Sequence, residues 1–131
     1  MSSESGPRPG TIVWQDLTVP NAEQVRDFYQ AVVGWESRPE DMEGYEDYHM
    51  IPPGSDQSAA GICHARGTNA SVPPQWLVYI AVEDVERSSA RCVELGGEIV
   101  DGPRPMGTLP FCVIRDPAGA VCALVQYPES A

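Results

Sequence analysis

The chain has 131 residues, a formal net charge of −11 at pH 7 and a hydrophobic content of 42%. This length fits one compact domain with its own core. The negative charge argues against binding to a nucleic-acid backbone, and no apolar run is long enough for a membrane span. We therefore expect no nucleic-acid partner and no membrane. The charge has an ordinary explanation in solubility, and it also favours a cationic ligand.

The first residues, MSSESGPRPG, have neither a basic start nor an apolar centre, so they lack the pattern of a signal peptide. We expect residues 1–10 and 128–131 to be tails, the first of them flexible, and the protein to be cytoplasmic. None of the four cysteines forms a C-x-x-C pair, and all stand among apolar residues. We expect free buried thiols rather than zinc ligands. These cysteines are Cys63, Cys92, Cys112 and Cys122.

A strand followed by a helix is predicted after the tail. Ile12–Val19 is rich in β-branched and apolar residues, as expected of a strand with one buried face. Pro20 breaks this strand, and Asn21 is expected to cap a helix over Ala22–Val33, where apolar residues recur at helical spacing. Gly34 follows the last apolar turn, which is where a C-cap glycine is expected.

Three further strands are predicted in the first half of the chain, at residues 36–39, 45–51 and 58–64. An acidic turn separates the first two, and a Pro-Pro-Gly turn separates the second from the third. Residues 65–75 contain glycine, asparagine, serine and two prolines. We expect this segment to link two modules.

The second half repeats the same order. The strand Trp76–Val82 precedes a helix over residues 85–95, with Asp84 as its N-cap. Strands are then predicted at three places, and the segment GPRPMG is expected to form an irregular loop between the first two. The three strands cover residues 98–101, 109–115 and 120–127.

An offset of 63 residues relates the two halves, because it pairs Val19 with Val82, Asn21 with Asp84 and Gly34 with Gly97. Side-chain identity is low, but the strand breaks and helix ends agree. We predict an α+β fold in which two βαβββ modules, residues 11–64 and 76–127, form a single domain. Strands that follow one another without a helix are expected to pair antiparallel.

Each helix is expected to cover one face of its half-sheet, and the two free faces are expected to enclose a cleft. Alternate residues of a strand point to opposite faces, so the residues that face the cleft can be predicted. They are Trp14, Asp16, Leu77, Tyr79, Ala123 and Val125.

Four motifs in this order resemble those of the vicinal oxygen chelate superfamily, which includes glyoxalase I, bleomycin-resistance proteins and extradiol dioxygenases. Each motif is weak alone, but their order and spacing agree over about residues 11–127. The resemblance implies paired βαβββ modules forming a U-shaped sheet around a cleft, and a homodimer. The motifs are Phe28-Tyr29 followed by Gly34-Trp35, then Val82-Glu83-Asp84-Val85, Leu95-Gly96-Gly97 and Asp116-Pro117-Ala118-Gly119.

The resemblance also implies where a metal would bind. Metal-dependent members hold a divalent ion with His and Glu from strands 1, 4, 5 and 8. These positions fall on Trp14, residues 60–62, Leu77 and Ala123, and none of them offers a ligand. A cation there would lose its water shell against apolar groups that have no lone pair to donate. We therefore expect no metal and no cofactor.

The leading hypothesis is a metal-free protein that binds or sequesters a cationic or aromatic small molecule. Core packing is the alternative for each predicted contact, and we favour it for Tyr48, Met50 and Phe111 taken singly. A structural, hydrogen-bonded carboxylate is the favoured alternative for Asp16. The predicted ligand-binding residues are Trp14, Asp16, Tyr48, Met50, Leu77, Tyr79, Phe111 and Ala123.

Two further hypotheses stay open. The first is an enzyme of the same superfamily, a lyase, isomerase or dioxygenase, in which Asp16, His49 or a tyrosine replaces the metal chemistry or a metal is held at unusual positions. The second is an interaction protein whose cleft is filled by its own side chains. Cys63 and His64 are a poor nucleophile–base pair, because neighbours in a strand point to opposite faces.

Overall fold

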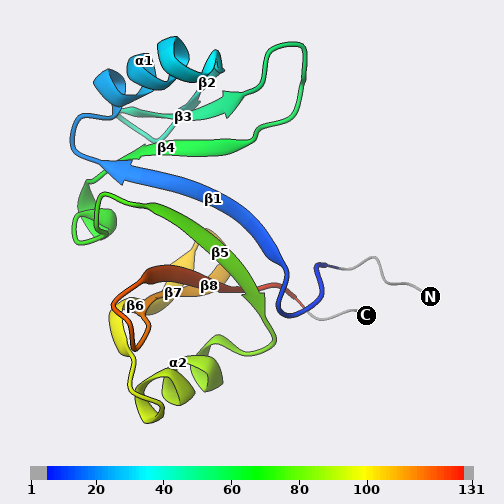
Figure 1. The fold of residues 1–131 in the computed structure, drawn as a ribbon, viewed down its shortest axis with the longest axis vertical. Coiled ribbons are helices and arrows are strands. Elements are labelled where there is room, and N and C mark those ends of the chain that lie inside the picture. The colour runs from blue at the N-terminus through cyan, green and yellow to red at the C-terminus, as the bar shows by residue number, and fades with distance from the viewer. Residues whose placement is uncertain (1–5, 129–131) are drawn as a thin grey trace. The chain divides into compact units, whose positions relative to one another are not determined.

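The computed structural model describes residues 6–128, and within them two helices and eight strands follow the order β-α-β-β-β twice (Figure 1). The predicted α+β class and the two βαβββ modules are confirmed. The elements of the first module are β1 (Ile12–Val19), α1 (Ala22–Val33), β2 (Glu36–Asp41), β3 (Glu46–Ile51) and β4 (Ala60–His64).

A short 3-10 helix, Gly67–Asn69, lies in the segment between the two modules. The chain divides into two compact units. The first unit is Trp14–Trp76, and the second contains the described residues 6–13 and 77–128. The elements of the second module are β5 (Trp76–Val82), α2 (Val85–Glu94), β6 (Glu98–Met106), β7 (Leu109–Arg115) and β8 (Val121–Gln126).

Strand pairing follows the same plan in both units. The order is β2-β3-β4-β1 in the first unit and β5-β8-β7-β6 in the second. The pairs that are consecutive in sequence are antiparallel, as predicted. Each unit also contains a parallel pair, β1 with β4 and β5 with β8. The cleft predicted from the sequence stays a prediction.

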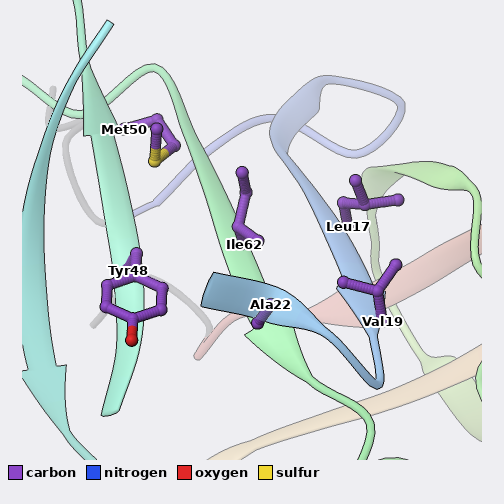
Figure 2. Close-up of a cluster of buried hydrophobic side chains, with 6 residues drawn as sticks. All are labelled: Leu17, Val19, Ala22, Tyr48, Met50 and Ile62. Carbon is purple, nitrogen blue, oxygen red and sulfur yellow. The ribbon is translucent and has the colours of Figure 1, made fainter. Parts of the chain in front are cut away.

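The core of the first unit lies between its strands and α1. Figure 2 shows six buried side chains, which come from β1, β3, β4 and the start of α1. Val25 and Tyr29 of α1 pack against them, together with Trp35. The opposite face of the same strands is free of the helix. The buried side chains are Leu17, Val19, Ala22, Tyr48, Met50 and Ile62.

The second unit repeats this arrangement. Val85 of α2 packs with Cys112 of β7 and Leu124 of β8, and partly buried side chains of β5 and β7 surround them. The helix-covered face is therefore the one that carries Cys112 and Leu124. Strand alternation places Phe111 and Ala123 on the opposite, helix-free face.

The helix ends agree with the sequence at two of three predicted caps. The backbone N–H of Gly34, at a φ of 88°, donates to the carbonyl of Gln30 over 3.1 Å. The side chain of Asp84 accepts a hydrogen bond from the N–H of Arg87 over 3.1 Å. Asn21 occupies the N-cap position but does not cap through its side chain, because its amide donates to the side chain of Gln24 instead.

Two strands continue past the ends predicted for them. β6 runs to Met106 through most of the segment predicted to be an irregular loop, and β2 runs to Asp41 through Pro39. Both strands stand at the end of the strand order in their unit. A proline removes a backbone donor, which an edge strand tolerates and a central strand does not. The pairing of β6 with β7 also shifts register around Asp101, which absorbs the irregular residues.

The N-terminal residues that the structure describes join the second unit. The N–H of Gly10 donates to the carbonyl of Ala81 over 2.7 Å, and the N–H of Ala81 donates to the carbonyl of Thr11 over 2.8 Å. Residues 1–5 of the predicted tail, and 129–131 at the other end, lie outside the described residues. Neither described helix combines the length and hydrophobicity that a membrane crossing requires.

We predict that Ile62→Ala lowers the free energy of unfolding by about 2–5 kcal/mol, because deleting a buried side chain leaves a cavity. Ile62 is 0% exposed, whereas Val32 on the outer side of α1 is 64% exposed. Val32→Ala, the matched control, is expected to stay within about 0.5 kcal/mol of the natural protein. Urea unfolding of the two variants checks this prediction, and equal losses would contradict the assigned core.

Candidate functional site

The helix-free face of the first unit brings two predicted site residues together with a histidine and a glycine. Asp16 of β1 lies opposite Gly61 of β4, and Gly61 lies opposite His49 of β3. Trp14, two residues before Asp16, points to the same side of β1. We call Trp14, Asp16, His49 and Gly61 the Trp14 face.

Gly61 gives the indole of Trp14 its place on this face. A Cβ atom at Gly61 would lie 3.4 Å from Cζ2 of Trp14 and 3.3 Å from Cβ of Asp16. The indole therefore reaches over the glycine backbone and past Asp16. Its ring centre is 6.3 Å from the ring of His49, in an edge-on arrangement at 61°. The half-buried indole thus keeps an aromatic surface beside an acidic and a basic side chain.

The electrostatic environment of this face is negative. Asp16 is 8% exposed and Asp47 is 6% exposed, and Glu40 of β2 lies directly opposite Asp47. Cys63 lies two residues after Gly61 in β4, and these charges affect the pKa of its thiol. Burial raises the pKa of its thiol most, and the charges of Asp16, Asp47 and Glu40 raise it further. Cys63 is therefore a neutral thiol rather than a nucleophilic thiolate.

Both ring nitrogens of His49 have hydrogen-bond partners. Its Nε2 lies 2.8 Å from Oε1 of Glu40, and its Nδ1 lies 3.0 Å from Oγ of Ser58. Sequence reasoning named His49 but missed Glu40 and Ser58. Their positions depend on strand pairing, because Glu40 is diagonal to His49 across β2 and β3 and Ser58 precedes β4. No local motif marks either residue.

Hydrogen bonds and ring contacts hold His64 in place. Asp47 accepts a hydrogen bond from the backbone N–H of His64 over 2.9 Å, and its Oδ1 lies 3.3 Å from Nδ1 of the same residue. The rings of Tyr45 and Tyr48 flank the imidazole. His64 follows Cys63 directly, so it points to the other side of β4, away from Asp16.

Two predicted site residues lie on the helix-covered face instead. Tyr48 and Met50 belong to the core cluster against α1, and they are 4% and 0% exposed (Figure 2). The guanidinium of Arg26 in α1 lies 4.6 Å above the ring of Tyr48. These contacts favour the core-packing alternative for both residues. Neither belongs to the Trp14 face.

The remaining predicted residues gather on the helix-free face of the second unit. Tyr79 lies opposite Ala123, and its ring stacks on Phe111 with 6.4 Å between centres and 18° between planes. Leu77 precedes Tyr79 by two residues and shares its side of β5. All four residues are buried, and none is more than 6% exposed.

Arg104 adds a positive charge to this second group. Its Cζ lies 4.7 Å above the ring of Phe111, and its Nε and Nη2 donate to the two carboxylate oxygens of Asp101 over 3.0 and 2.8 Å. The hydrogen bond to Asp101 raises the pKa of Arg104. Such a two-point pair holds a guanidinium in one orientation over the aromatic ring.

The donor set at the family's metal positions does not fit a divalent ion. Trp14, Leu77 and Ala123 present indole, isobutyl and methyl groups, and the β4 position presents Ala60, Gly61 or Ile62. Within residues 6–128, no group of three or more His, Cys, Asp or Glu side chains is arranged to hold a metal.

We predict that Cys63 in the folded protein reacts with a thiol-specific disulfide reagent at about pH 8 roughly 100-fold more slowly than in denaturant. Its raised pKa leaves little thiolate there, so the rate increases as the pH rises. Asp47→Asn removes a nearby negative charge and is expected to speed the reaction, whereas Glu46→Gln, on the neighbouring exposed residue, is not. Peptide mass mapping follows the modification. Equal rates in the folded and unfolded chain would contradict the burial of the thiol.

Comparisons with known proteins identify the family. The sequence profile of the Glyoxalase/Bleomycin resistance protein/Dioxygenase superfamily matches residues 11–124. "Putative glyoxylase CFP32" of Mycobacterium bovis is 27% identical over 118 residues, which are 89% of this chain and 44% of that protein. "Anthracycline biosynthesis protein DnrV" of Streptomyces peucetius is 30% identical over 123 residues, which are 92% of this chain and 43% of that protein.

The fold comparison agrees with the sequence comparison. A solved structure titled as a hypothetical protein, BH1468 from Bacillus halodurans C-125, matches with a TM-score of 0.58 at 14% identity, covering 95% of this chain and 99% of that one. The chain spans less than half the length of the curated relatives that it matches. Because the profile covers most of its length, the chain belongs to the Glyoxalase/Bleomycin resistance protein/Dioxygenase superfamily.

Proposed function

We propose that this chain binds a flat small molecule with cationic or aromatic character, without a metal ion, and that the Trp14 face supplies its principal contact. The observation that carries the proposal is the position of Trp14. Its indole lies over Gly61 and next to Asp16, so an aromatic surface and a negative charge are adjacent. An aromatic face attracts a cation or stacks on another ring, and a neighbouring carboxylate adds to the first effect.

The charge of the chain supports the same choice of ligand. The net charge is −11, and Asp16, Asp47 and Glu40 all lie close enough to Cys63 to raise its pKa. A cation gains from this potential on approach, whereas an anion is repelled. The second unit offers a similar aromatic pair, Tyr79 and Phe111, on its own helix-free face.

The named relatives are consistent with a small-molecule role. One is named as a glyoxylase and the other as a protein of anthracycline biosynthesis. Anthracyclines are flat polycyclic aromatic compounds, and a half-buried indole can stack on such rings. Since this chain spans less than half of either relative, the names support a ligand class and not a reaction.

An enzyme with a non-standard site is the second candidate, and one observation favours it. His49 has both ring nitrogens in hydrogen bonds, one to a carboxylate and one to a hydroxyl. A positioned imidazole of this kind is what acid–base chemistry requires. The Trp14 face therefore combines a recognition surface with a group that can transfer a proton.

We predict that proflavine, a planar aromatic cation, binds the metal-free protein and that Trp14→Ala weakens binding about tenfold, the loss of roughly 1–2 kcal/mol of stacking and cation–π energy. Trp76→Ala is the matched control, because Trp76 is also partly exposed but contacts Tyr29 and Trp35 instead. A fluorescence titration measures both variants.

Pyrenesulfonate, a planar anion, tests the charge preference in the same assay. The negative potential of the face predicts weaker binding of this anion than of proflavine. Equal affinity of the natural protein and Trp14→Ala for proflavine would contradict the placement of the site. Equal affinity for the cation and the anion would contradict its electrostatic character.

A further inference from the structure

His49 of the Trp14 face forms a continuous hydrogen-bonded chain with Glu40 and Ser58. Glu40 is on β2, His49 is on β3, and Ser58 is in the segment just before β4. The separations are 2.8 Å from Glu40 Oε1 to His49 Nε2 and 3.0 Å from His49 Nδ1 to Ser58 Oγ. Both distances lie within the range of well-formed hydrogen bonds. The chain links a carboxylate, an imidazole and a hydroxyl in that order.

One tautomer of His49 gives these hydrogen bonds the direction that catalysis needs. A carboxylate oxygen accepts, so in this tautomer Nε2 of His49 carries the proton that it donates to Glu40. Nδ1 then holds the lone pair, and the hydroxyl of Ser58 donates to it. This is the state in which an imidazole can take a proton from a serine. Relative to the serine-protease arrangement the two ring nitrogens exchange partners, but a hydroxyl, a base and an orienting carboxylate are present in the same roles.

The surroundings leave Ser58 able to react. Ser58 is partly exposed, and His49 keeps 30% of its side chain exposed. The indole of Trp14 stands at the edge of the His49 ring and provides an apolar wall.

We propose that Ser58 is a nucleophile for acyl transfer from small esters, with His49 as its general base and Glu40 as the residue that positions His49. This proposal goes beyond ligand binding and does not depend on it. Neither the profile match nor the named relatives assign these three residues.

The proposed reaction balances with water as the second substrate. Oγ of Ser58 forms a bond to the ester carbonyl carbon, and its proton moves to Nδ1 of His49. The carbon–alkoxy bond breaks, and the departing alkoxide takes this proton and leaves as an alcohol. Water then attacks the acyl-serine, again giving a proton to His49, and the serine oxygen recovers it as the carboxylic acid is released.

A small alkyl fluorophosphonate tests the nucleophile directly, because Ser58 Oγ would bond to phosphorus and expel fluoride. We expect a single adduct on the full chain, located at Ser58 by peptide mapping. It should be absent in Ser58→Ala and retained in Ser55→Ala, which removes a hydroxyl from the same loop without touching His49. The absence of an adduct at Ser58, under conditions that label a reference serine hydrolase, would overturn the proposal.

Variants of His49 and Glu40 test whether Ser58 is activated by a general base or reacts only because its hydroxyl is exposed. His49→Gln is expected to slow labelling by at least about 100-fold, the usual contribution of a general base. Glu40→Gln keeps the imidazole and is expected to slow labelling by roughly tenfold, with partial recovery in Glu40→Asp, because the carboxylate acts through the orientation of the ring. Circular dichroism verifies the fold of each variant. Labelling at the natural rate in folded Glu40→Gln and His49→Gln would overturn the assignment.

Discussion

The parallel pairing of β1 with β4, in the register that sets Asp16 opposite Gly61, is the constraint on which the site of the first unit depends. It decides which residues of β1 join the core with α1 and which stay on the helix-free face. A slip of one residue would exchange the two sets, burying Trp14 and Asp16 against the helix and exposing Leu17. The large apolar area buried by Leu17, Ile62 and Met50 makes that exchange costly. Core packing thus fixes the position of Trp14.

The same register places acid–base side chains on the Trp14 face, which also carries the β1 position at which the family resemblance implies a metal ligand. The positions that would supply metal ligands in the two units hold indole, methyl and isobutyl groups, which stabilise no cation by coordination. The acid–base side chains of the first unit stand two residues further along β1 or on neighbouring strands. Asp16, Glu40 and His49 are examples, and each is placed by cross-strand pairing rather than by a local motif. The lack of metal ligands at these positions is compatible with the small-molecule binding that we propose for the Trp14 face.

Much of the fold could be predicted because strong local signals determine it. Gly34 and Asp84 end and begin helices for reasons that act within a few residues, and the 63-residue offset follows from such signals. β6 was predicted to end early because its prolines read as breakers, while their tolerance depends on an edge position that local sequence does not reveal. Tyr48 and Met50 were candidate ligand contacts for which core packing was favoured, and alternation alone does not tell which side of β3 the helix covers. Ser58 could not be found, because its partner His49 lies across a strand pair.

The central claim is that this chain acts on small molecules through its own side chains and not through a bound divalent ion. The direct measurement is the metal content of protein purified without chelator, followed by calorimetric titration with nickel, zinc, manganese and iron(II). The account predicts a content far below one ion per chain and no tight binding of any of the four, because the family's ligand positions hold Trp14, Leu77 and Ala123. Tight binding near one ion per chain would contradict it and would make Asp16 and His49 the first residues to test as ligands.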